Sequence, residues 1–187
     1  MKKILITGGT GFVGKQLIPF LVEKGYSIHV LTRKPSANSL KNICFFQWDI
    51  ERQYIDKKAF EGVEILINLT GANIGEKRWT EQRKKEIIDS RIKSIDLLYQ
   101  YISENKFNIN IFISSSAVGF YGGVTTDKTF VETSESGNDF LASVSQKWED
   151  ATLKFNDLGI RTVILRKGVI LGKEGGMVKK LSPLAKL

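Results

Sequence analysis

The sequence predicts an α/β protein built on a doubly wound parallel sheet, and two observations support this fold class. Short apolar runs alternate along the chain with longer segments of helical spacing, as in a parallel sheet whose crossover helices cover both faces. A glycine-rich turn also follows the first apolar run directly and opens the first helical segment. At 187 residues, the chain is long enough for one domain with a sizeable core.

The glycine-rich turn, Thr-Gly-Gly-Thr-Gly-Phe-Val-Gly, occupies residues 7–14, between a strand expected over 3–7 and a helix expected over 12–24. Glycine can adopt positive φ in a tight turn and lets the backbone approach a pyrophosphate. The helix N-terminus adds free N–H groups and the positive end of its dipole. Two spacings fit, Gly9-Gly11-Gly14 and Gly8-Gly11-Gly14, and the context predicts a dinucleotide site rather than a turn without a ligand.

A second strand is expected over residues 27–32, and its end bears on the choice of cofactor. NAD sites commonly place Asp or Glu there, where the carboxylate binds the ribose 2′-hydroxyl. This chain has Thr32, Arg33 and Lys34 without a carboxylate. The two cations suit the 2′-phosphate of NADP, so we expect NADP rather than NAD; the alternative is that Arg33 and Lys34 simply begin a solvated loop.

Two further strands are expected in the first half of the chain. Residues 42–48 form one that ends at Asp49, whose carboxylate could meet an adenine amino group. A polar connection over 51–61, with a short helix, leads to a continuous apolar run over 63–69, which is typical of a strand covered on both faces. Small and polar residues follow that run, where the backbone would pass the cofactor.

The second half of the chain continues the alternation. We expect a helix over 81–105, capped by Thr80, with Ile88, Ile92, Ile95, Tyr99 and Ile102 on its buried face. The elements expected after it are a strand over 109–113, a functional or mobile loop of about two dozen residues, a helix over 140–156 capped by Asp139, and a strand over 161–165.

Composition limits the partners. The net charge of +8 suits anionic small molecules and would also suit nucleic acid, but the basic residues are dispersed, so we expect a small-molecule substrate and no nucleic acid. The single cysteine, Cys44, fits a reducing compartment, and no apolar run reaches membrane-spanning length or signal-peptide form. We therefore expect a cytoplasmic protein, monomeric or homodimeric, with no membrane partner and no metal.

The motifs together resemble the extended, atypical branch of the short-chain dehydrogenase/reductase superfamily, and more narrowly the epimerase-family proteins grouped with NAD-dependent epimerase/dehydratases. The segments that carry the resemblance are residues 6–14, 68–74, 78–80, 89–92, 114–122, 139–142 and 148–149. The resemblance implies a Rossmann fold, the Gly8-Gly11-Gly14 spacing and an NADP-type cofactor. It also implies that residues 1–174 form the NADP-binding domain, and that 175–187 begin a smaller substrate-facing part that is mostly absent from this truncated chain.

The residue patterns and the resemblance together give a set of expected cofactor contacts, most of them at the carboxyl ends of strands. The set comprises Gly8, Thr10, Gly11, Phe12, Val13, Gly14, Thr32, Arg33, Lys34, Asp49, Leu69, Thr70, Gly71, Ala72, Ser90, Ser114, Ser115 and Lys167.

The resemblance further implies a catalytic serine, tyrosine and lysine. In such a set the tyrosine exchanges a proton with the substrate, the lysine lowers its pKa, and the serine binds the carbonyl oxygen. Ser116 matches the serine, but alignment on the Trp-Glu pair at 148–149 places Leu141 and Ser145 at the other two positions, where neither can do this chemistry. Tyr121 is the only tyrosine placed to substitute, although it also suits plain loop packing.

The only Tyr-x-x-x-Lys motif in the sequence, at Tyr54 and Lys58, precedes the strand over 63–69 and is interpreted as chance. The sequence thus favours an NADP-dependent, atypical oxidoreductase or epimerase-like enzyme that uses Ser116 and Tyr121 on a small hydroxyl or carbonyl substrate, for which a nucleotide sugar is one candidate. The alternative is a cofactor-binding redox sensor or regulatory module without turnover. Nucleic-acid binding is the third and weakest hypothesis.

Overall fold

The structure is a computed structural model that describes residues 1–35 and 41–172. In these residues a single seven-stranded sheet forms the centre of the protein. The strands follow the order β4-β3-β2-β1-β5-β6-β7, and all neighbours are parallel except β3 and β4. Their bounds are β1 Lys3–Thr7, β2 Ser27–Thr32, β3 Ile43–Asp49, β4 Tyr54–Ile55, β5 Val63–Asn68, β6 Ile111–Ala117 and β7 Arg161–Lys167, and the short β8, Leu171–Gly172, follows.

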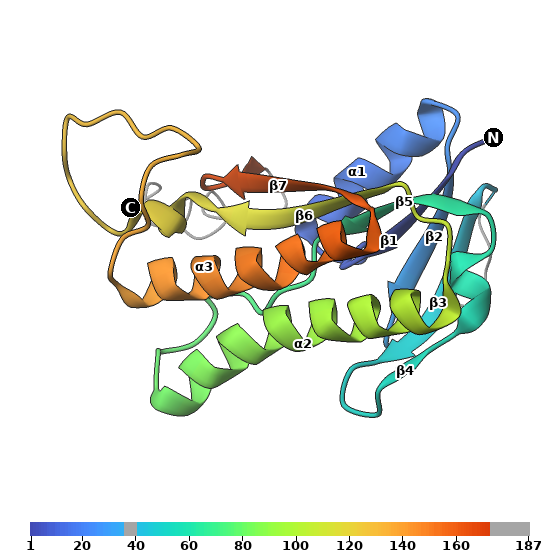
Figure 1. Ribbon diagram of the computed structural model, residues 1–187, viewed down its shortest axis with the longest axis horizontal. Helices are drawn as coiled ribbons and strands as arrows, with labels where there is room; N and C mark the ends of the chain where they lie inside the picture. The colour runs from blue at the N-terminus through green and yellow to red at the C-terminus, as the bar shows by residue number, and fades with distance from the viewer. Residues whose placement is uncertain (36–40, 173–187) are drawn as a thin grey trace, which may run out of the picture.

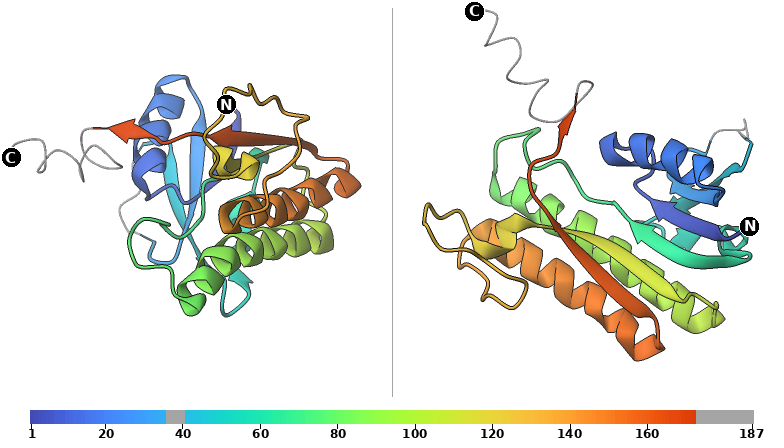
Figure 2. Two further views of the ribbon diagram at one scale, coloured as in Figure 1. Left: turned by 90° about the vertical axis from the view of Figure 1, so that its left-hand side faces the viewer. Right: turned by 90° about the horizontal axis from the view of Figure 1, so that it is seen from above.

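Helices cover both faces of this sheet. α2, Glu81–Asn105, and α3, Phe140–Leu153, lie side by side on one face, and α1, Phe12–Glu23, lies on the other (Figures 1 and 2). Three short 3-10 helices complete the structure: η1 Lys57–Phe60, η2 Val118–Tyr121 and η3 Lys154–Leu158. The prediction of a doubly wound α/β fold is therefore confirmed.

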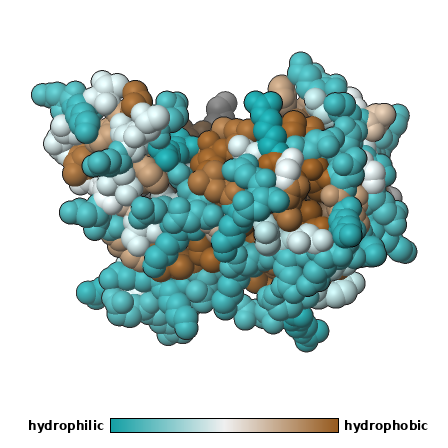
Figure 3. Space-filling model, viewed as in Figure 1, coloured by the Kyte–Doolittle hydropathy of each residue, from teal (hydrophilic) through white to brown (hydrophobic). Residues whose placement is uncertain are grey.

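Two apolar clusters separate cleanly by face, because successive side chains of a strand point to opposite sides. Leu5, Leu66 and Phe112 pack toward α2 and α3, whereas the neighbouring Ile4 and Ile67 pack toward α1. The strands thus bury both of their faces, which explains why they are almost continuously apolar in the sequence. In Figure 3 the rim of the molecule along α2 is hydrophilic, and apolar residues gather nearer the centre of this face.

Several element boundaries differ from those expected. β6 begins at Ile111 rather than at 109 and extends to Ala117, so the three serines belong to the strand and not to the following loop. The helix expected over 140–156 ends at Leu153 and continues as η3, which Gly159 terminates at φ 73°. The connection over 51–61 contains the antiparallel strand β4 as well as the short helix η1. The segment expected to begin a second part, 175–187, lies outside the described residues.

The buried face of α2 also differs in part from the expected one. Ile95 and Ile102 are buried, but Ile88, Ile92 and Tyr99 are only half-buried. Ile87, Leu97 and Leu98 are buried instead. The reason is that α2 packs against α3 as well as against the sheet, so its apolar surface is wider than one stripe. Among the described helices, none has the length and apolar character needed to cross a membrane.

Candidate cofactor site

The glycine turn after β1 is shaped by contacts that exclude side chains. Gly8 adopts φ +69°, and a Cβ there would lie 2.7 Å from the carbonyl carbon of Leu69. The turn closes with a hydrogen bond of 3.0 Å from the Gly11 N–H to the Gly8 carbonyl oxygen. A positive φ combined with contact to the end of β5 requires glycine at this position, which supports the Gly8-Gly11-Gly14 spacing.

α1 begins immediately after this turn, and its first residues leave backbone donors available. A Cβ at Gly14 would overlap the backbone of Gly9, so this glycine lets the helix pack directly on the turn. Gly11 is the N-cap and supplies no side-chain hydrogen bond. The N–H groups of Phe12, Val13 and Gly14 have no partner within a helix that starts here, so they form an anion-binding end of the kind that holds phosphates.

A largely apolar groove of about 720 Å³ adjoins this helix end. Phe12 and Val13 line it from α1, and Ile170, Leu171 and Gly172 line it from β8 and the residue before it. Two of the expected cofactor contacts thus face open space beside the turn.

The turn lies at the point in the sheet where the strand order reverses. The chain runs from β1 through β2 to β3 on one side, then returns to β5 on the other side of β1 and continues to β6 and β7. Ligands of open α/β sheets bind at the carboxyl ends of the strands at such a switch point. Leu69 and Thr70, which follow β5, lie against the turn here, and Thr70 Oγ1 is buried without a hydrogen-bond partner in the described part of the chain.

A buried polar chain holds the strand ends beneath the turn. Thr7 Oγ1 donates to Asn68 Oδ1 at 2.6 Å, and Asn68 Nδ2 donates to Ser114 Oγ at 3.3 Å. Thr152 Oγ1 of α3 lies 3.3 Å from the same serine hydroxyl and donates its proton to the Trp148 carbonyl at 2.8 Å. Ser114, an expected cofactor contact, is fully buried in this chain and positions β5 and β6 relative to each other.

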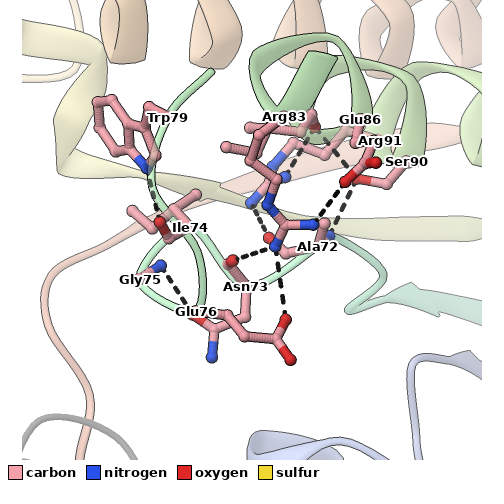
Figure 4. A network of polar contacts seen from close by, with 11 residues as sticks. Ala72, Asn73, Ile74, Gly75, Glu76, Trp79, Arg83, Glu86, Ser90 and Arg91 are labelled. Atoms are coloured by element: carbon pink, nitrogen blue, oxygen red, sulfur yellow. Dashed lines mark hydrogen bonds and ion pairs between the residues drawn. The ribbon is translucent and has the colours of Figure 1, made fainter. Parts of the chain in front are cut away.

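Side chains of α2 hold the loop after β5 in place (Figure 4). Ser90 Oγ accepts a hydrogen bond of 3.0 Å from the Ala72 N–H, and Arg91 Nη2 donates to the Ala72 carbonyl at 3.2 Å. Arg83 Nη2 donates to the Asn73 carbonyl at 2.7 Å. Ser90, another expected contact, therefore acts in this structure by fixing the backbone of Ala72.

Other expected contacts lie at the same edge of the sheet. Thr32 ends β2, Arg33 and Lys34 follow it, and both cations are exposed. Asp49 ends β3, where its Oδ1 accepts hydrogen bonds from the Glu51 and Arg52 N–H groups and so caps the turn. The carboxylate expected near an adenine is thus already engaged by its own backbone.

The serines of β6 alternate between the two faces. Ser114 and Ser116 face α3, whereas Ser115 faces the α1 side, where Lys167 Nζ donates to its hydroxyl at 2.7 Å. Lys167 is half-buried, and burial, with a further contribution from the nearby charge of Arg91, lowers its pKa below the ordinary lysine value.

One polar network joins the two candidate catalytic residues. Ser116 Oγ donates to Glu149 Oε1 at 2.5 Å, and Glu149 forms an ion pair of 2.8 Å with Arg166. Arg166 Nη1 in turn donates to Tyr121 Oη at 2.9 Å. The hydrogen bonding of Arg166 to the Glu149 carboxylate, more than any other contact, raises the pKa of Arg166. The central pair, Glu149 and Arg166, was absent from the predicted site, although Glu149 lies in one of the segments that carry the family resemblance and Arg166 directly follows the strand expected over 161–165.

The positions that should carry tyrosine and lysine are filled by residues that only pack. Leu141 is half-buried and its Cβ lies 3.4 Å from the position that a Cβ on Gly119 would take. Ser145 is buried. Tyr54 and Lys58 lie in β4 and η1, at the opposite edge of the sheet from β6 and β7, and take no part in this site.

A glycine turn at the switch point of a doubly wound sheet defines a nucleotide-binding protein of the Rossmann class. The model of the family described as "NAD dependent epimerase/dehydratase family" matches residues 4–175. The chain belongs to this family.

Curated relatives extend well beyond the matched part. Epimerase family protein YfhF of Bacillus subtilis is 35% identical over 181 residues, which are 96% of this chain and 59% of the relative. Epimerase family protein ML0860 of Mycobacterium leprae is 32% identical over 181 residues, 97% of this chain and 57% of the relative. The chain thus spans less than two thirds of the length of these relatives.

Solved structures agree in fold. The nucleoside-diphosphate sugar epimerase from Corynebacterium glutamicum superposes with a TM-score of 0.80 at 32% identity, covering 99% of this chain and 38% of that one. The human epimerase family protein SDR39U1, solved with NADPH, gives a TM-score of 0.77 at 24% identity, covering 97% of this chain and 58% of that one. The second likeness concerns the fold alone.

Proposed function

We propose that this chain is the NADP(H)-binding part of an atypical oxidoreductase or epimerase-like enzyme that acts on a small substrate bearing a hydroxyl or carbonyl group. The observation that carries the proposal is the turn at Gly8, where a Cβ would meet Leu69 at 2.7 Å and the following helix α1 begins without a side-chain cap. The groups present fit a dinucleotide, because the helix end suits a pyrophosphate and no described residue provides a hydrogen-bond partner for Thr70 Oγ1. A bound nicotinamide would supply hydride transfer.

The choice of NADP rests on charge. Arg33 and Lys34 are exposed at the end of β2, and within the described residues neither forms an ion pair with a carboxylate. Two free cations favour a 2′-phosphate over a 2′-hydroxyl.

The network of Ser116 and Tyr121 would handle the substrate proton. The Ser116 proton is directed to Glu149, so the serine oxygen is left as an acceptor for a substrate hydroxyl. The Tyr121 hydroxyl donates to the Val131 carbonyl at 3.1 Å and accepts from Arg166, which fixes its orientation. Nucleotide sugars are the first substrates to test, because the relative from Corynebacterium glutamicum is a nucleoside-diphosphate sugar epimerase.

A second candidate function is a cofactor-binding redox sensor or regulatory module without turnover. It is favoured by Leu141 and Ser145, which pack at the positions where the family places the tyrosine and lysine. Under either function we propose a small molecule, rather than a membrane or a nucleic acid, as the partner, and a monomer or homodimer in the cytoplasm.

Titration of the full-length protein with NADPH and NADH, followed by nucleotide fluorescence, tests the proposal. We expect NADPH to bind about tenfold more tightly than NADH, which corresponds to one charge-assisted contact. Absence of binding by both nucleotides would overturn it. Turnover of a nucleotide sugar or carbonyl compound that Ser116→Ala abolishes would establish the enzyme and exclude the sensor.

A further inference from the structure

Two aromatic side chains meet where α2 and α3 begin. Trp79 directly precedes Thr80, the N-cap of α2, and Phe140 is the first residue of α3. Their ring centres are 5.4 Å apart, with the rings at 61° to each other. Both helices start at the edge of the sheet toward which β6 and β7 point (Figure 1), and ligands of open α/β sheets bind at this edge.

Trp79 presents its indole to solvent, unlike the other tryptophans of the chain. It is 39% exposed, whereas Trp48 and Trp148 are 3% and 6% exposed. Ile74, whose carbonyl contacts the indole, is 37% exposed and extends the apolar surface. An exposed indole can stack on the face of another flat ring, and this contact suits any nucleobase because every base has a π-face.

The loop that carries Trp79 is held in place by its own contacts (Figure 4). Trp79 Nε1 donates a hydrogen bond of 2.7 Å to the Ile74 carbonyl, which fixes the orientation of the indole. Arg83 Nη2 donates to the Asn73 carbonyl at 2.7 Å and ties the same loop to α2. Because the indole is already oriented, the binding of a ring to it costs little conformational entropy.

The charges around the two rings favour an anion. The three carboxylates within residues 73–86 each form an ion pair with a cation of α2, Glu76 and Glu86 with Arg83, and Glu81 with Lys84. Lys77 and Arg78, which precede Trp79, are exposed, and among the described residues no carboxylate forms an ion pair with either. Lys77 and Arg78 can therefore bind a phosphate group of a ligand whose ring lies on Trp79.

The two rings belong to the helices of one face of the sheet, and the pyrophosphate donors belong to the helix of the other. Those donors are at the start of α1, and α1 covers the face opposite α2 and α3 (Figure 2). A ring that stacks on Trp79 is therefore expected from a ligand other than the cofactor.

We propose that Trp79 and Phe140 bind the base of a nucleoside phosphate that forms part of the substrate. Lys77 and Arg78 bind its phosphate groups. The proposal rests on the proposed function and narrows its substrate class to compounds that carry a nucleoside phosphate. Recognition needs both parts of the ligand, because stacking alone accepts any flat ring.

The test uses the full-length protein, with and without saturating NADPH, and isothermal titration with uridine diphosphate and guanosine diphosphate. We expect at least one of the two to bind the wild type, and Trp79→Ala to weaken that binding about tenfold. Trp79→Phe keeps an aromatic face and should bind within about threefold of the wild type. Tyr54→Ala is the matched control, because it removes an exposed aromatic side chain from β4, at the opposite edge of the sheet from β6 and β7.

Two further measurements address the phosphate and the indole separately. Arg78→Gln should weaken diphosphate binding about tenfold, whereas Lys24→Gln, which removes an exposed charge at the far end of α1, should leave it unchanged. The difference in fluorescence between wild type and Trp79→Phe reports Trp79 alone. Acrylamide should quench this signal, and the bound diphosphate should protect it.

Failure of this proposal differs from failure of the proposed function. If neither diphosphate binds the wild type, or if Trp79→Ala and Tyr54→Ala bind equally well, the site is overturned while NADPH binding still stands. A loss of NADPH affinity in Trp79→Ala, without binding of either diphosphate, assigns the indole to the cofactor and also overturns it. If NADPH fails to bind, diphosphate binding that Trp79→Ala weakens and Tyr54→Ala does not still supports the site.

Two other outcomes would also overturn the site. If acrylamide leaves the Trp79 signal unquenched, another part of the full-length protein covers the indole. Glucose 1-phosphate that binds as tightly as the diphosphates, with the same dependence on Trp79, would place a sugar ring rather than a base on the indole.

Discussion

Arg166 donates a hydrogen bond to each carboxylate oxygen of Glu149, from Nε to Oε1 at 2.9 Å and from Nη2 to Oε2 at 2.8 Å. The same guanidinium lies 3.6 Å from the centre of the Phe120 ring. It therefore ties the end of β7 to α3 and to η2 through one side chain. The pair is mostly buried, with 18% of the arginine and 8% of the glutamate side chain exposed.

Glu149→Gln should destabilise the protein, because it leaves Arg166 as an uncompensated and largely buried charge. We expect the free energy of unfolding to fall by about 3 kcal/mol, as measured by urea denaturation at neutral pH. Asp150→Asn, an exposed neighbour on the same helix, should change it by no more than about 0.5 kcal/mol. Equal effects of the two substitutions would show that the ion pair contributes no net stability.

Gly8→Ala should impair both folding and cofactor binding. Gly8 and Gly25 both adopt positive φ, at +69° and +86°, but a Cβ on Gly25 would meet no atom within 4 Å. Gly25→Ala should therefore cost only the backbone strain, about 1 kcal/mol, whereas Gly8→Ala should cost about 3 kcal/mol and abolish NADPH binding. Urea unfolding and NADPH titration of both variants check this. Retention of NADPH binding by Gly8→Ala would argue against the turn as the cofactor site.

The local signals of the sequence predicted α2 completely. Thr80 caps it, since its Oγ1 accepts a hydrogen bond of 3.2 Å from the Arg83 N–H, and the helix ends where Lys106 turns left-handed at φ 50°. Its burial was predicted less well, because contact with a second helix is a tertiary property. β6 was predicted too short for a similar reason: serines signal a loop, and here partners on other elements bury them.

The candidate site was predictable where it depends on neighbouring residues and not where distant ones meet. The glycine turn and the cations after β2 lie together in the sequence. Glu149 and Ser116 lie 33 residues apart, and Lys167 and Ser115 lie 52 apart. The packing of α3 on β6 brings Glu149 to Ser116, and the pairing of β7 with β6 brings Lys167 to Ser115. No spacing along the chain encodes either contact.

His29, the single histidine of the chain, should make stability depend on pH. It is buried in β2 with Nδ1 2.7 Å from the Ala59 carbonyl oxygen, and burial lowers its pKa below the ordinary value of 6.5. Below about pH 6.5 the unfolded state therefore binds more protons than the folded state, and the free energy of unfolding decreases until the folded imidazole also protonates. The difference between wild type and His29→Gln should accordingly shrink as the pH falls from about 7 to about 5. A constant difference over this range, or an NMR titration of His29 at its ordinary pKa, would contradict the prediction.

Arg33→Gln should lower the preference for NADPH over NADH. Because Arg33 is exposed and follows β2, its replacement should remove a contact with the 2′-phosphate and leave the fold intact. We expect NADPH affinity to fall about tenfold and NADH affinity to change less than about twofold, measured by fluorescence titration of the full-length protein. Lys24→Gln serves as the control, since it removes an exposed positive charge at the opposite end of α1, away from the glycine turn. A parallel loss of NADPH affinity in both variants would mean that general positive charge, and not a phosphate contact at Arg33, attracts the cofactor.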